Sequence, residues 1–135
     1  LEEYQVIADP DRLEQVLHNL IGNALKFVQA KTGHIHVELS SIKSGFDNPN
    51  EGAIILSIRD NGIGIPKEKI ATIFDKYTQV RSSDAKIGTG LGLSICKRII
   101  GQHRGDIDIK STEGKGTTFY LYLPILVPSV HVKAA

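Results

Sequence analysis

Apolar residues recur at helical spacing near the start of the chain and at strand spacing further along. Between Leu13 and Phe27 they come at steps of three and four residues, which predicts one long amphipathic helix. Asp9 is the expected N-cap of this helix, and Pro10 suits its first position. Gly33 marks the end region of the helix.

Alternating patterns predict two pairs of strands. The strands are expected at residues 34–42, 53–59, 106–111 and 117–123. In the first of them Ile35, Val37 and Leu39 alternate with polar residues, so this strand is expected to be half-buried. It is expected to pair antiparallel with the second, and the turn 114–116 joins the last two strands.

Two further helices are expected between these strands. A short one opens at Ile65-Pro66 and runs to about Phe74, and another begins near Gly90 and ends at Gly105. Residues 78–89 lack periodicity, which predicts a mobile loop. Helices segregated against a mostly antiparallel sheet form a two-layer α/β (α+β) sandwich, predicted for one domain over residues 1–125, with a tail at 126–135.

Composition restricts the function classes only a little. The formal net charge is +1, which gives no overall attraction to nucleic acid. The single cysteine, Cys96, excludes an internal disulfide framework, fits a reducing compartment, and is expected in the core. No apolar run approaches the length that spans a bilayer.

The first helix carries a polar edge that could bind a nucleotide. Asn19, Asn23 and Lys26 lie four and three residues apart, so they share one face. Carboxamide oxygens are suitable ligands for Mg²⁺, and a lysine can neutralise phosphate charge. The same spacing is equally typical of the solvated flank of an amphipathic helix, and this motif alone does not decide between the two.

The second motif runs from Asp60 to Gly64, at the end of an apolar strand. A carboxylate at that position can accept a hydrogen bond from the exocyclic amine of adenine, and the glycines would let the backbone approach a flat base. An Asp-Asn-Gly sequence is also a good turn, and taken alone the turn is the better interpretation.

The third motif, residues 88–93, alternates glycine with other residues and leads into a helix. Unpaired amides at a helix start carry the positive end of the dipole and bind anions. The sequence is neither a Walker A motif nor a dinucleotide fingerprint. Phosphate binding is therefore favoured here over a purely structural role for the glycines.

The three motifs in this order resemble the catalytic ATP-binding domain of sensor histidine kinases over residues 6–124. The resemblance implies an N box at Asn19 to Lys26, an F box at Phe74 and Tyr77, and a Bergerat fold. That fold is a mixed, mostly antiparallel sheet covered on one face by three helices. The implied nucleotide site comprises Asn19, Asn23, Lys26, Phe27, Asp60, Gly62, Ile63, Gly64, Ile65, Tyr77, Arg81, Lys86, Gly88, Thr89, Gly90, Leu91, Gly92, Leu93 and Thr117.

The resemblance also implies an activity, cofactors and partners. ATP and Mg²⁺ would bind, with Asn23 as the metal ligand and Asn19 and Lys26 as catalytic residues. The γ-phosphate would pass to a histidine on a separate dimerisation hairpin, and then to a response-regulator receiver domain. The isolated domain is expected to be monomeric and cytoplasmic and to bind no nucleic acid. The sequence leaves open whether the parent protein is bound to a membrane.

Two positions bear on the choice between related functions. ATP-hydrolysing members of the same fold carry a glutamate four residues before the magnesium-binding asparagine, where this chain has Asn19. An amide cannot act as a general base, which argues against an efficient ATPase. Gln79 stands where the family often has a basic residue, and Arg81 or Lys86 could replace it. A regulatory nucleotide-binding module without chemistry fits the same motifs.

Overall fold

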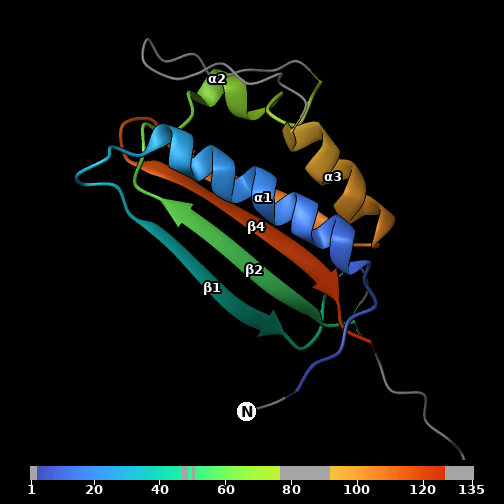
Figure 1. Ribbon diagram of the computed structural model, residues 1–135. Coiled ribbons are helices and arrows are strands. Elements are labelled where there is room, and N and C mark those ends of the chain that lie inside the picture. The colour runs from blue at the N-terminus through green and yellow to red at the C-terminus, as the bar shows by residue number, and fades with distance from the viewer. Residues whose placement is uncertain (1–2, 47–48, 50, 77–91, 127–135) are drawn as a thin grey trace, which may run out of the picture.

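The computed structural model describes residues 3–46, 49, 51–76 and 92–126, which form a four-stranded sheet and three helices (Figure 1). The helices are α1 (Pro10–Phe27), α2 (Lys67–Ile70) and α3 (Gly92–Gln102). The strands are β1 (Ile35–Ile42), β2 (Ala53–Asp60), β3 (Asp106–Thr112) and β4 (Gly116–Pro124). The expected fold class is confirmed, and the expected strands differ from the observed ones by a residue or so at the ends.

The sheet has the strand order β1-β2-β4-β3. All three pairs of neighbouring strands within the described residues are antiparallel. The pairing of β1 with β2 confirms the antiparallel pair predicted from the sequence. Gly114 and Gly116 both have positive φ in the turn between β3 and β4, which explains why two glycines stand there.

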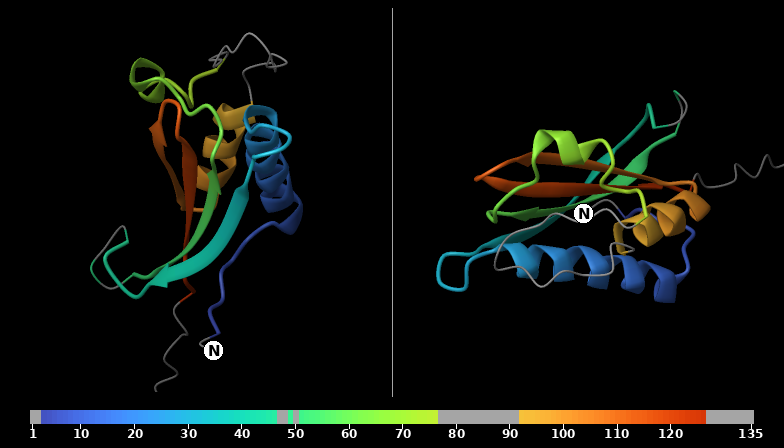
Figure 2. Two further views of the ribbon diagram at one scale, coloured as in Figure 1. Left: turned by 90° about the vertical axis from the view of Figure 1, so that its left-hand side faces the viewer. Right: turned by 90° about the horizontal axis from the view of Figure 1, so that it is seen from above.

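The two longer helices cover one face of this sheet (Figure 2). α1 contacts β2 and α3, while α3 also contacts β3 and β4. α2 lies beyond the end of the sheet and contacts β3. The buried core between the layers consists of Val16, Leu20, Ile58, Cys96, Ile99, Ile100, Ile107, Phe119 and Leu121. Cys96 is fully buried, as its apolar neighbours in the sequence predicted.

α1 begins as the sequence predicted and ends earlier. The Asp9 carboxylate accepts hydrogen bonds from the amides of Asp11 and Arg12 at 3.0 and 3.3 Å, so the N-cap is confirmed. The helix ends at Phe27, six residues before the glycine that was expected to mark its end. Gly33 instead closes a separate turn, in which its amide donates to the Gln29 carbonyl.

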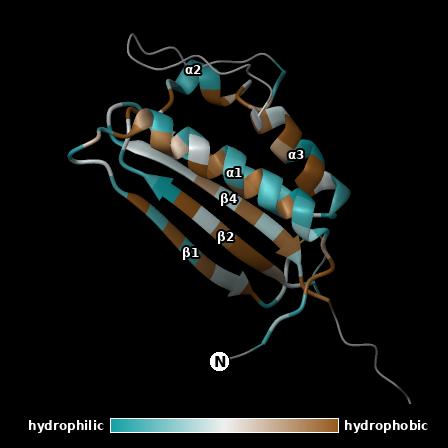
Figure 3. Cartoon of the chain, viewed as in Figure 1, coloured by the Kyte–Doolittle hydropathy of each residue, from teal (hydrophilic) through white to brown (hydrophobic). Residues whose placement is uncertain are grey.

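The expectation of a half-buried β1 is only partly correct. Ile35 is half-buried, whereas Val37 and Leu39 are 50% and 68% exposed. The reason is the placement of the helices: α1 lies over β2 and leaves most of β1 uncovered at the edge of the sheet (Figure 3). The short helix α2 also ends sooner than expected, at Ile70. The loop predicted at residues 78–89 lies outside the described residues.

Candidate functional site

The end of α1, the end of β2 and the start of α3 carry the described residues of the three motifs, and all three face one end of the sheet. The loop after β2 is held there between α1 and the β3–β4 turn. The Ile63 amide donates to the Phe27 carbonyl at 3.3 Å, and the Gly114 amide donates to the Ile63 carbonyl at 2.7 Å. The end of α1, the loop after β2 and the turn after β3 thus form one connected surface.

Asp60 is the buried carboxylate of this surface. It is only 8% exposed, and one of its oxygens accepts the Gly62 amide at 2.9 Å. Burial raises the pKa of the Asp60 carboxyl, and hydrogen bonds from the backbone of Gly62 and Thr117 partly oppose that shift. Backbone hydrogen bonds fix the orientation of this carboxylate, so it is suited to accept a further hydrogen bond from an amine.

The glycines after Asp60 allow close packing of the protein's own backbone. A Cβ on Gly62 would stand 2.5 Å from the Phe27 carbonyl oxygen, and one on Gly64 would stand 2.2 Å from that of Thr112. Both glycines are therefore required by close approach of the protein's own backbone. Their expected role, approach to a flat base, stays a prediction.

Asn61 is a structural residue that the sequence did not single out. Its side-chain oxygen accepts the His34 amide at 2.7 Å, and its side-chain nitrogen donates to the Thr32 carbonyl at 2.9 Å. The Asn61 amide in turn donates to the His34 carbonyl. These three bonds tie the loop before β1 to the loop after β2. The Asp-Asn-Gly turn signal was compatible with this role but did not identify the partners.

Asn19 connects α1 to α3 within the protein. A Cβ added to Gly92 would lie 3.7 Å from the Asn19 carboxamide, so the start of α3 passes close to this side chain. Burial raises the pKa of the Cys96 thiol to about 11, while a hydrogen bond with the Asn19 side chain opposes the shift. The first and third motifs therefore meet at this contact.

Asn23 and Lys26 occupy the same helix edge. Asn23 is half-buried, Lys26 is exposed in the last turn, and the Asn23 carboxamide has no hydrogen bond to another described residue. The described residues contain no group of three or more His, Cys, Asp or Glu side chains that could hold a metal ion. A carboxamide oxygen fits Mg²⁺, which keeps several waters and takes other ligands from phosphates.

Thr117 supplies a hydroxyl beside Asp60, and Ser111 supplies a second one on the far side of Thr117. Thr117 is 6% exposed, and its hydroxyl oxygen lies 2.8 Å from that of Ser111. The Ser111 hydroxyl also accepts the amide of Ile65 at 2.8 Å. Ser111 could not be identified from the sequence, because a serine at the end of an alternating strand carries no distinctive signal.

Phe74 follows α2 in the chain and packs against the core. Its ring makes an edge-on contact with Phe119, with centroids 6.3 Å apart, and the Lys97 ammonium lies 5.3 Å from its centroid. Of the remaining candidate residues, Phe27 and Leu93 are half-buried and Ile65 is buried. The candidates outside the described residues are Tyr77, Arg81, Lys86, Gly88, Thr89, Gly90 and Leu91.

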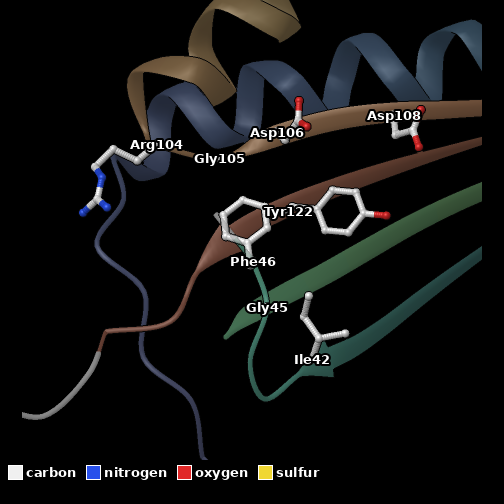
Figure 4. Close-up of a pocket in the computed structure, with 8 residues that line it drawn as sticks. All are labelled: Ile42, Gly45, Phe46, Arg104, Gly105, Asp106, Asp108 and Tyr122. Atoms are coloured by element: carbon white, nitrogen blue, oxygen red, sulfur yellow. The ribbon is translucent and has the colours of Figure 1, made fainter. Parts of the chain in front are cut away.

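A separate open pocket of about 640 Å³ lies at the opposite end of the sheet (Figure 4). Phe46 and Tyr122 stack in it with centroids 5.9 Å apart, and Asp106 and Asp108 stand on β3 beside them. Burial raises the pKa of the Tyr122 phenol, and the charges of Asp108, Tyr120 and Asp106 add to that shift. None of the described residues of the three motifs lines this pocket.

The fold and this arrangement agree with one family. Residues 8–127 match the family described as "Histidine kinase-, DNA gyrase B-, and HSP90-like ATPase", and the chain belongs to it. SrrB, a sensor protein of Staphylococcus aureus, is 46% identical over 118 residues, which cover 86% of this chain and 19% of SrrB. The sensor histidine kinase WalK of Bacillus subtilis is 41% identical over 118 residues, covering 86% of this chain and 18% of WalK.

Solved structures give the same result. The mycobacterial sensor histidine kinase MprB has a TM-score of 0.73 at 30% identity, covering 90% of this chain and 78% of that one. Full-length ShkA in complex with AMPPNP has a TM-score of 0.73 at 29% identity, covering 98% of this chain and 26% of ShkA. The present chain is thus a histidine-kinase-type ATP-binding domain, and it spans 10% to 19% of the curated relatives it matches.

Proposed function

We propose that this chain is the catalytic domain of a sensor histidine kinase, which binds ATP with Mg²⁺ and transfers the γ-phosphate to a histidine on a separate helical hairpin. The observation that carries the proposal is the buried Asp60 carboxylate between the end of α1 and the β3–β4 turn. It stands at the same end of the domain as the carboxamide of Asn23, which has no hydrogen-bond partner among the described residues.

Each part of the nucleotide has a partner of matching chemistry. Asp60 accepts the exocyclic amine of adenine, and Asn23 coordinates Mg²⁺ through its oxygen. Lys26 provides charge for the phosphates, and the amides of residues 88–92 complete the phosphate site. Phosphoryl transfer depends mainly on positioning and charge neutralisation, so these residues suffice without a covalent intermediate on this domain.

The environment of Asn19 supports transfer over hydrolysis. Related ATPases place a carboxylate at this position to activate water. Here the position holds an amide that lies beside Gly92, at the start of α3. An amide takes no proton near neutral pH, so the domain has no general base at this point. The phosphate then passes to a response-regulator receiver domain, in the cytoplasm where ATP is available.

The experiment supplies the hairpin dimer of the parent protein in trans, with labelled ATP and Mg²⁺. The domain should label the hairpin histidine, while alone it neither labels itself nor hydrolyses ATP at a useful rate. Asn23→Ala should lower the transfer rate at least roughly 100-fold through loss of the metal ligand. Gly22→Ala is the matched control, because its added Cβ meets nothing within 4 Å.

Three outcomes would overturn the proposal. Rapid ATP hydrolysis by the domain alone would make it an ATPase. A stable phosphohistidine on one of its own five histidines would place the acceptor inside this chain. Tight ATP binding without transfer to the parent's own hairpin would identify a regulatory nucleotide-binding module.

A further inference from the structure

Three polar side chains form a row across neighbouring strands at the nucleotide end of the sheet. Asp60 on β2 is directly opposite Thr117 on β4, and Thr117 is directly opposite Ser111 on β3. Residues paired in this way point to the same face of a sheet. The row lies on the helix-covered face, because Thr117 is two residues before the core residue Phe119 and side chains two residues apart in a strand point to the same face.

Ser111 is at the centre of a small hydrogen-bond network. Its hydroxyl oxygen accepts the Ile65 amide at 2.8 Å, lies 3.0 Å from the Gly116 carbonyl oxygen, and lies 2.8 Å from the Thr117 hydroxyl oxygen. A hydroxyl has one proton to donate and two lone pairs to accept with. The Ile65 amide can only donate, so it always takes one of the two lone pairs of Ser111.

The single proton of Ser111 then determines what Thr117 can do. If Ser111 donates to the Gly116 carbonyl, Thr117 must donate to Ser111, and toward a ligand it can only accept. If Ser111 donates to Thr117, the proton of Thr117 is free to point toward a ligand. The two arrangements present opposite chemistry at the same oxygen.

We propose that Ser111 is a positioning residue, which donates to Thr117 in the nucleotide complex and so makes the Thr117 hydroxyl a donor toward N1 of adenine. This inference rests on the proposed function. Adenine offers an amine donor and the N1 acceptor side by side, which matches the Asp60 acceptor and a Thr117 donor. Guanine offers an acceptor and an N–H donor at these places, so the same arrangement rejects it.

The network also explains how Ser111 can affect adenine recognition without touching the base. Thr117 is buried, and its hydroxyl orientation is set by whichever neighbour holds the next hydrogen bond. Ser111 also holds the loop after β2 through the Ile65 amide, which keeps Asp60 and Thr117 in one register. Orientation and loop position are therefore linked through a single side chain that does not itself contact the base.

The test measures dissociation constants for ATP and for 1-deaza-ATP, in which a C–H group replaces N1. The wild-type domain should bind ATP roughly tenfold more tightly than 1-deaza-ATP. Thr117→Val should bring this ratio close to one. Ser111→Ala should lower it, because the Thr117 hydroxyl loses the neighbour that fixes its orientation, and in the Thr117→Val background the alanine substitution should change it no further. Ser111→Thr, which keeps the hydroxyl, should restore the wild-type ratio. The ATP-to-GTP preference should fall in the same two single variants.

Outcomes that contradict the inference are distinct from failure of the proposed function. If Ser111→Ala weakens ATP and 1-deaza-ATP equally, Ser111 is only structural and the inference is wrong. If the wild-type domain binds no ATP, the proposed function itself is wrong. Ser111→Cys is the second variant should the alanine variant fail to fold. Its thiol is a poor donor of similar size, and the ratio should again fall toward one.

Discussion

Gly64 stands where two backbone segments almost touch, and its φ of 69° adds a second constraint on the residue type. A side chain there meets the Thr112 carbonyl oxygen at 2.2 Å. Gly64→Ala should therefore lower the free energy of unfolding by at least about 3 kcal/mol. Gly22→Ala is the matched control in an open helical position and should raise it by about 0.5–1 kcal/mol. Urea unfolding of both variants measures the difference. An unchanged free energy of unfolding in Gly64→Ala would show that the loop after β2 is not held so close to the Thr112 carbonyl.

Asp60 should leave a signature in the pH dependence of stability. Burial raises its folded-state pKa above the unfolded value, so the folded state holds its proton more tightly. Its contribution to stability is therefore largest at low pH and declines as pH rises from about 4 through the raised pKa. Asp60→Asn does not titrate. The unfolding free energy of the wild type relative to this variant should fall over that range and become flat above it. A relative stability that rises with pH would contradict a buried Asp60.

At the scale of elements, His103 links the end of α3 to the start of α1. Its Nε2 accepts the Asp9 amide at 2.9 Å, and its Nδ1 lies 2.8 Å from the Ile99 carbonyl oxygen, to which it donates in the tautomer that the Asp9 amide requires. His103→Ala should cost about 1–3 kcal/mol, because it leaves the amide and the carbonyl without their partner. The matched control is His18→Ala, whose side chain is 76% exposed and should change stability by less than about 0.5 kcal/mol. Equal effects of the two substitutions in denaturant titrations would show that the link is not formed.

The elements themselves were largely predictable, and the exceptions have identifiable causes. The start of α1 followed from Asp9 and Pro10, because a cap and a first-turn proline act locally. The exposure of Val37 and Leu39 could not be predicted, because it depends on which strands the helices cover. Alternation of residues shows that a strand has an apolar and a polar face. It does not show whether a helix layer covers the apolar face.

The candidate site shows the same division between local and long-range information. The motifs identified Asp60 and the Asn19 edge, because residue type and spacing decide what chemistry is available. They did not identify Ser111 or the partners of Asn61, whose hydrogen bonds cross 46 and 27–29 residues of sequence. Such contacts exist only once the strands are in register, and a single sequence carries no record of that register.

For the whole molecule, the positions of the two described chain ends have a mechanical consequence. The Leu126 amide donates to the Gln5 carbonyl at 2.7 Å, so the incoming and outgoing segments leave from one pole, far from the loop that holds Asp60 (Figure 1). The 18 residues of α1 separate the two poles by roughly 27 Å. A rotation of about 30° about this pole would move the opposite pole through roughly 14 Å. A small rotation about the described chain ends therefore becomes a large displacement of the loop that holds Asp60.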